Sequence, residues 1–447
     1  MGGSAFSTGN QPLNTPRMTP EVYERVKAQC HAALRNIYLC VASPIDGPGK
    51  IDYGDIDILV AWEKSSILGK EQSKYPPFAT KQDACRAIQE SLGASFLKME
   101  NGGDHYAVPW PEDESSTEEQ ASSVSPSRRY VQVDITICDT LDQMQWKLFK
   151  HAHGDLWSIL GTIIRPYGLT IDEQALWVRI TEIERFNKNK SKVFLTNNPY
   201  KVLSFLGLDA SNKYWDAPFE SLDAMYEYAA TCRLFCSFSF TSPELPLPSA
   251  QSSASSLSKN VSQTQETSQK PNASDKKRMN SRPAYNKFIN EFIPQCRKDE
   301  RFTEFKSSVE SVRREAFGRF KGAKETFEKQ RIEFLCERDR EEITAKLKNE
   351  WVPAVDPNDL NQCQYRGCQI KAFKRIIFEG DNSYEGIVPG EELKDEVGRM
   401  IEEKVEQFVK RHMDTIGKIA YSKQQQAYAK HMNQQGLERQ QAPLLML

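Results

Sequence analysis

Two short segments, each with an apolar residue at every second position, constrain the fold of this chain more than any other feature. They are residues 54–60 (Gly-Asp-Ile-Asp-Ile-Leu-Val) and residues 131–137 (Val-Gln-Val-Asp-Ile-Thr-Ile). The alternation predicts two β-strands, because successive side chains of a strand point to opposite faces of its sheet. Asp55 and Asp57 then share one face of the first strand, and Asp134 lies on the polar face of the second. If the two strands are neighbours, three carboxylates converge on one spot.

Three converging carboxylates predict a metal site. Like charges at close range oppose one another's ionisation, and a divalent cation removes that conflict. Oxygen ligands with few His or Cys residues nearby favour Mg²⁺ or Mn²⁺ over Zn²⁺. The alternative is that the Asp-x-Asp pair is an ordinary solvated strand surface. The third acid, Asp134, favours the metal site because it matches the pair and lies in a strand of unusually clean alternation.

Composition sets the class of protein. A chain of 447 residues predicts two or three domains. Its 59 Lys and Arg against 61 Asp and Glu give no overall basic field of the kind that indicates nucleic-acid binding. The ten cysteines show no Cys-x-x-Cys spacing, which disfavours structural zinc. Free thiols in a chain of this size indicate a reducing, intracellular compartment, cytoplasmic or nuclear. No apolar run approaches the roughly 18 residues of a membrane helix, so we expect a soluble protein without a membrane partner.

The N-terminal half reads as one module of mixed structure. Residues 1–18 are polar and predicted to be disordered, and residues 19–140 form the part that holds both acidic strands. Within it, Thr19 and Pro20 predict a helix start, and the acidic, Ser-rich residues 111–128 predict a mobile insertion. Residues 141–240 are predicted to be a helical extension of this module.

The C-terminal half has a different composition. Residues 241–283 are rich in Ser, Gln, Asn and Thr and predict a disordered linker. Residues 284–421 predict a helical module, including a helix marked by apolar residues from Leu393 to Phe408, and the Gln-rich residues 422–447 predict a flexible tail. The predicted fold class is therefore α/β, of the α+β type: a small mixed sheet with flanking helices, plus a separate helix-rich C-terminal module.

The order of these elements resembles a known fold. The chain has, in order, a helix, a strand, a turn-rich loop, a strand with Asp-x-Asp and a later antiparallel strand with a third Asp. This order is similar to the nucleotidyltransferase fold of DNA polymerase beta, its family X relatives, and the CCA-adding and poly(A) polymerases. The likeness rests on residues 54–60 and 131–135 and covers about residues 20–140.

The resemblance implies both an activity and roles for the three acids. Asp55 and Asp57 would bridge two Mg²⁺ or Mn²⁺ ions, and Asp134 would ligate the ion that activates the attacking hydroxyl. The implied reaction moves a nucleoside monophosphate from an NTP to a hydroxyl acceptor and releases pyrophosphate. A nucleic acid is one of several acceptors compatible with the resemblance, beside a protein or a small molecule.

One departure from the family pattern concerns the triphosphate. The family usually has a Gly-Ser pair before the turn-rich loop, where this chain has Ala42 and Ser43 followed by Pro44, which lacks an N–H donor. The residues that the resemblance assigns to nucleotide binding are Ala42, Ser43, Lys50 and Gly54. The departure keeps two alternatives open. The first is a catalytically degenerate nucleotidyltransferase-like protein that acts as an interaction module, and the second is a nucleic-acid binder without transfer activity.

A histidine-rich motif precedes one predicted helix. Residues 151–155 read His-Ala-His-Gly-Asp, and two imidazoles with a carboxylate are an acceptable metal ligand set. A short Gly-containing turn capped by Asp155 is the simpler interpretation, so we expect a helix start here.

Overall fold

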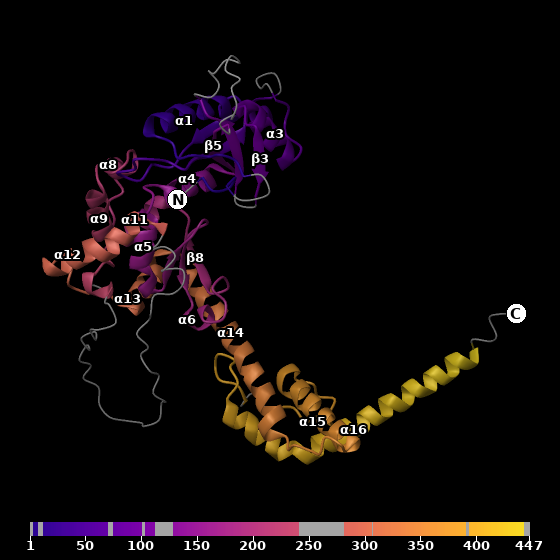
Figure 1. Ribbon diagram of the computed structural model, residues 1–447. Coiled ribbons are helices and arrows are strands. Elements are labelled where there is room, and N and C mark those ends of the chain that lie inside the picture. Colours follow the sequence, from indigo (N-terminus) through magenta and orange to yellow (C-terminus); the bar gives the residue numbers. More distant parts are fainter. Residues whose placement is uncertain are drawn as a thin grey trace. The chain divides into compact units, whose positions relative to one another are not determined.

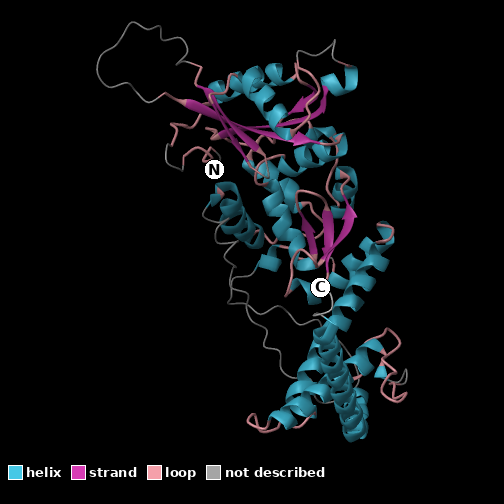
Figure 2. Ribbon diagram, turned by 90° about the vertical axis from the view of Figure 1, so that its right-hand side faces the viewer, coloured by secondary structure: helices cyan, strands magenta, loops and turns pink. Residues whose placement is uncertain are grey.

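The computed structural model describes residues 3–7, 12–69, 75–100, 103–111, 128–240, 281–305, 307–389 and 393–441. The chain divides into two compact units. Unit 1 comprises Met1–Arg179 and Lys192–Lys321, and unit 2 comprises Ile180–Ser191 and Gly322–Leu447. A mixed sheet in unit 1 and a helix-rich C-terminal region confirm the predicted fold class (Figures 1 and 2).

A five-stranded sheet in unit 1 contains both acidic strands. Its strand order is β1-β2-β5-β4-β3, with bounds Tyr38–Ala42, Asp55–Glu63, Tyr130–Cys138, Asp104–Pro109 and Phe96–Met99. Strands β2 and β5 are adjacent and parallel, whereas every other neighbouring pair in this sheet is antiparallel. The two strands predicted from alternation therefore lie side by side, with β5 antiparallel to β4 on its other side.

Helices α1 (Pro20–Leu34) and α3 (Lys81–Leu92) pack on one face of this sheet. The Thr19 side chain accepts the Val22 N–H in the first turn of α1, as the sequence predicts. Helix α3 begins with a capping box, in which Thr80 and Asp83 each accept the other's backbone N–H. It ends at Gly93, which has the left-handed conformation common after helix C-termini.

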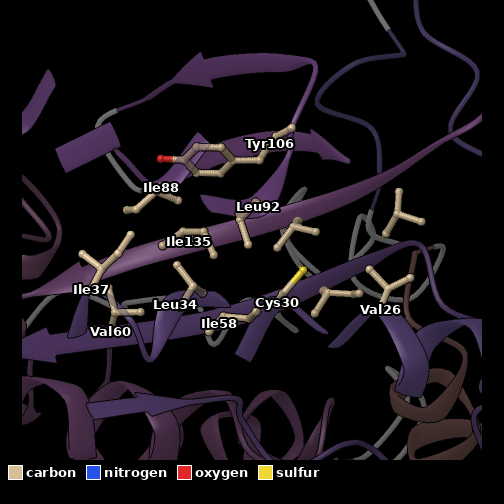
Figure 3. Packing of buried hydrophobic residues seen from close by; sticks show 14 of the residues in the cluster. Val26, Cys30, Leu34, Ile37, Ile58, Val60, Ile88, Leu92, Tyr106 and Ile135 are labelled. Carbon is tan, nitrogen blue, oxygen red and sulfur yellow. The ribbon is translucent and has the colours of Figure 1, made fainter. Parts of the chain in front are cut away.

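The main core of unit 1 lies between these helices and the sheet (Figure 3). Strand β2 contributes Ile56, Ile58 and Val60, which are its even-numbered residues. The core also takes side chains from both helices and from the neighbouring strands, among them Val26, Leu34, Ile88, Tyr106 and Ile135. The alternation in the sequence thus reflects one face packed on helices, and the acids occupy the opposite face.

Helix α4 (Leu141–His151) packs on that opposite face. A second cluster joins Met144 of α4 to Leu59, Ala61 and Cys138, near the carboxyl ends of β2 and β5. Asp55 and Asp57 precede Leu59 on the same face, because residues i and i+2 of a strand share a face. We call this polar part the acid face; it comprises Asp55, Asp57, Gln132, Asp134 and His105.

The predicted helical extension at 141–240 is only partly helical. It contains α5 (Leu156–Ile164), α7 (Pro199–Leu206) and α9 (Leu222–Ala230). It also holds a three-stranded antiparallel sheet, which the prediction missed, formed by β6 (Leu169–Ile171), β7 (Leu176–Arg179) and β8 (Lys192–Thr196). These strands are three to five residues long, and so short a segment shows little alternation.

The predicted module boundary at residue 284 is wrong. Helices α11 (Pro283–Lys287), α12 (Ile293–Lys298) and α13 (Val309–Arg319) belong to unit 1. The Tyr226 hydroxyl donates to the Ala284 carbonyl at 2.7 Å, and the Tyr226 and Phe288 rings lie 5.5 Å apart. The C-terminal part of unit 2 begins at Gly322 instead. The predicted insertion (111–128) lies outside the described residues except for residues 111 and 128, and the predicted linker (241–283) does so except for residues 281–283.

Unit 2 consists of helices within the described residues. These are α6 (Thr181–Glu184), α14 (Ala323–Lys346), a π-helical turn (Leu347–Trp351), α15 (Leu360–Glu379) and α16 (Glu402–Gln441). Phe373, Ile376 and Val409 lie at the centre of its core. Helix α16 begins at Glu402, later than the predicted Leu393, and continues to Gln441 through most of the predicted tail at 422–447. None of the described helices is long and apolar enough to cross a membrane.

Candidate functional site

The pairing of β2 with β5 brings the three predicted acids onto one face. Asp57 is the register partner of Asp134, and Asp55 is the partner of Gln132. Neighbouring strands are about 4.8 Å apart, so paired residues on the same face are side-chain neighbours. The condition for convergence, that the two strands are sheet neighbours, is therefore met.

A third strand adds a histidine that sequence reasoning missed. His105 on β4 is the register partner of Asp134, and its Nδ1 lies 2.7 Å from Asp134 Oδ1. The Gln132 amide also donates to Asp134, at 2.9 Å to Oδ1 and 3.2 Å to Oδ2. Both partners orient the Asp134 carboxylate. The contact of His105 follows only from the strand register, and His105 lies directly before the apolar residues Tyr106–Val108 of β4. Gln132 shares a face with Asp134 because the two residues are two positions apart on β5.

Two acids of this face, Asp57 and Asp134, have raised pKa values. The pKa of Asp57 is raised from 3.8 to about 6, first by desolvation from the protein atoms around it and then by the negative charges of Asp55 and Asp134. Part of the Asp57 residue is nevertheless exposed to solvent. Burial also raises the pKa of Asp134, against the opposing hydrogen bonds from His105 and Gln132. For His105, burial lowers the pKa, but the hydrogen bond to Asp134 and the charge of Glu100 outweigh it and raise the pKa overall.

The acid face fits a hard divalent cation by the type of its donors. Carboxylate oxygens are the ligands that Mg²⁺ and Mn²⁺ prefer. As the side chains stand, however, no three His, Cys, Asp or Glu residues in the described part of the chain are gathered closely enough to hold one ion. Asp134 accepts from His105 and Gln132, and Asp55 accepts from the Gly3 N–H at 3.0 Å. A cation would have to replace some of these hydrogen bonds.

The predicted nucleotide-binding residues are not all free to bind a ligand. The Ser43 hydroxyl lies 2.9 Å from His31 Nε2 of α1, and Lys50 Nζ lies 3.4 Å from Asp46. The charge of Lys50 still reaches the acid face, because it lowers the pKa of Asp57 against the main upward effects. Ala42 packs beside the α4 cluster. The carbonyl oxygen of Gly54 lies next to Gly3, and a Cβ atom at residue 3 would clash with it.

The two histidines of the 151–155 motif lie in different surroundings. His151 is exposed at the end of α4, where its Nε2 lies 2.7 Å from Glu173 and its charge lowers the pKa of Asp57. His153 is fully buried between the rings of Trp215 and Phe219, and burial lowers its pKa to about 4. The two do not form a metal ligand pair. Helix α5 follows the motif as predicted, but the predicted cap is wrong, because the Asp155 side chain makes no capping hydrogen bond and pairs with Arg282 at 2.8 Å instead.

The arrangement is thus a row of carboxylates with a histidine and a glutamine that fix one of them, bordered by the charges of Lys50 and His151. Its donors are of the type that hard divalent cations prefer, although the side chains as they stand do not gather around one ion. Compared with models of known protein families and with curated protein sequences, the chain matches none of them.

Proposed function

We propose that this protein is a Mg²⁺- or Mn²⁺-dependent nucleotidyltransferase that moves a nucleoside monophosphate from an NTP to a hydroxyl acceptor and releases pyrophosphate. The observation that supports it most is the register of β2 and β5, which sets Asp57 opposite Asp134 with Asp55 on the same face. The raised pKa of Asp57 adds support, because a cation relieves the charge repulsion that contributes to it.

The roles of the residues follow from their contacts. Asp55, Asp57 and Asp134 would hold the metal ions, which supply nucleophile activation and charge neutralisation when bound. His105 and Gln132 orient the Asp134 carboxylate. Lys50 and His151 place positive charge near Asp57, on the side where an anionic ligand would be attracted.

A degenerate protein with this fold and without catalysis is the alternative. It is favoured by the engagement of Ser43 with His31 and of Lys50 with Asp46, which leaves fewer groups for a triphosphate. Pro44 also removes a backbone donor next to Ser43.

Label transfer from NTPs separates the two functions. The full chain is incubated with each labelled NTP, Mg²⁺ or Mn²⁺, and a panel of DNA, RNA, tRNA, protein and small-molecule acceptors. We expect transfer that is lost in Asp55→Asn and Asp57→Asn. Asp139→Asn, which removes an exposed carboxylate just after β5, is the matched control and keeps the activity. Equal transfer by all three variants would exclude the proposed site, and absence of transfer by every protein would favour the alternative.

A further inference from the structure

The N-terminal residues 3–7 lie across the acid face, and we call them the strap. The Gly3 N–H donates to Asp55 Oδ2 at 3.0 Å, and the Ala5 N–H donates to Gln132 Oε1 at 3.0 Å. Lys98 Nζ donates to the Ala5 carbonyl at 3.2 Å. These partners come from β2, β5 and β3, so the strap crosses several strands of the sheet. Residues 1–18, expected to be disordered, thus make defined contacts in their described parts.

The following residues hold the strap in place. The Leu13 N–H donates to the Phe6 carbonyl at 3.0 Å, and the Thr15 hydroxyl donates to the Gly3 carbonyl at 3.2 Å. Phe6 itself is buried. Further along, Met18 and Tyr53 exchange two backbone hydrogen bonds of 2.7 and 3.0 Å. Gly3 and Phe6 of the strap are therefore bonded to Thr15 and Leu13, and Met18 in turn is bonded to Tyr53, just before β2.

Gly3 has a conformation and a position that other residues cannot share. Its φ is +82°, and a Cβ added there would lie 2.2 Å from the Gly54 carbonyl oxygen. Both facts exclude an L side chain, because neither the left-handed backbone nor a backbone contact this short tolerates one. A single methyl group at residue 3 should therefore lift the strap away from Asp55.

We propose that the strap is an autoinhibitory element, which occupies the acid face and has to leave Asp55 before a divalent cation and its nucleotide bind there. The inference rests on the proposed function, since it concerns access to the same carboxylates. The Asp55 carboxylate is the shared group, because the Gly3 amide binds one of the two oxygens that it could offer to a cation. Gln132, which orients Asp134, is also occupied by the strap.

Carboxyl labelling tests whether the strap covers Asp55, and it does not depend on any enzymatic activity. Full-length protein, Gly3→Ala and Ser4→Ala are treated with a carbodiimide and an amine, and labelling of each Asp is followed by mass spectrometry. Ser4 is exposed, so its variant is the matched control. We expect Asp55 to react several-fold faster in Gly3→Ala alone, with exposed Asp139 as the internal reference. Phe6→Ala, which loosens the strap at another point, should act in the same direction. Unchanged Asp55 labelling in both variants would overturn the inference.

Mn²⁺ titration then separates the inference from the proposed function. Because a hydrogen bond to a charged group is replaced, we expect Gly3→Ala to bind Mn²⁺ about tenfold more tightly than the unaltered chain, with Ser4→Ala unchanged. Equal Mn²⁺ affinity of the unaltered chain, Gly3→Ala and Ser4→Ala, together with nucleotide transfer, would overturn the autoinhibitory role of the strap. The proposed function would then still stand. Faster labelling of Asp55 without Mn²⁺ binding or transfer in any protein would overturn both.

Discussion

At the scale of single residues, ionisation of carboxylates on the acid face lowers the stability of the folded protein. Asp57 carries this most clearly, because its pKa of about 6 lies well above the ordinary 3.8. An acid with a raised pKa in the folded state contributes stability below its unfolded pKa and loses that contribution as pH rises through the folded one. The stability lost between about pH 4 and pH 6 is recovered if a cation binds the ionised group.

Replacement of Asp57 with Asn should therefore stabilise the protein at neutral pH. We expect Asp57→Asn to have a higher melting temperature than the unaltered chain at pH 7.5. The difference should shrink as pH falls from 6 towards the unfolded pKa of 3.8, below which Asp57 is mostly protonated in both states. Thermal unfolding at several pH values, without divalent ions, measures this. Asp139→Asn should show no such pH-dependent gain, and a lower melting temperature for Asp57→Asn at pH 7.5 would contradict the argument.

The two neighbouring histidines should act on different acids. His105 contacts Asp134, whereas the charge of His151 acts on Asp57. We expect His105→Ala to raise the pKa of Asp134 further, because burial then acts without the opposing hydrogen bond. His151→Ala should raise the pKa of Asp57 instead. Carboxyl ¹³C titration by NMR reads both values, and a shift of both acids in either variant would show that the two histidines are not separable.

At the scale of elements, helix starts are set by local hydrogen bonds that can be tested one at a time. We expect Thr80→Ala to destabilise unit 1 by about 1 kcal/mol, because it removes the capping box at the start of α3. Ser211→Ala is the control, since Ser211 precedes helix α8 (Asn212–Trp215) without a side-chain capping bond. Denaturant unfolding measures both, and an equal effect of the two changes would mean that the capping bonds of Thr80 contribute little.

The same local signals explain which elements could be predicted from the sequence. Strands β2 and β5 were predictable because one face is apolar along their length, and α1 and α3 because their caps and stripes agree. The predicted start of a helix at Leu393 is wrong, because Gly398 has a φ of +89° and Lys394 forms a β-bridge with Met400. The chain therefore turns before α16 begins. Apolar spacing alone does not reveal such a turn.

Prediction of the site was limited in a similar way. The three acids could be placed on one face because strand periodicity fixes the direction of their side chains. Their partners could not, because His105 reaches Asp134 through the β4–β5 register and Gly3 reaches Asp55 over 52 positions of sequence. Side chains and amides that meet only through tertiary pairing leave no local pattern.

At the scale of the whole molecule, residues on both sides of the segment 241–280 build unit 1. Beyond that segment, Phe288 is fully buried, and the Thr162 and Tyr285 hydroxyls lie 3.0 Å apart. Arg233 also pairs with Glu315 at 2.9 Å. The composition change that predicted a domain boundary here therefore marks a segment between two parts of one packed unit.

This organisation predicts that two separate pieces of the chain assemble. If tagged residues 1–240 and untagged residues 281–447 are co-expressed, we expect them to co-purify, because the buried surface around Phe288 and Tyr226 joins them within unit 1. Phe288→Asp in the second piece should abolish recovery, since it places an unpaired charge in that core. Phe305→Ala, at a side chain 49% exposed, is the control and should leave recovery unchanged. Recovery of the Phe288→Asp piece in normal amount would place the two sides of the segment in separate domains after all.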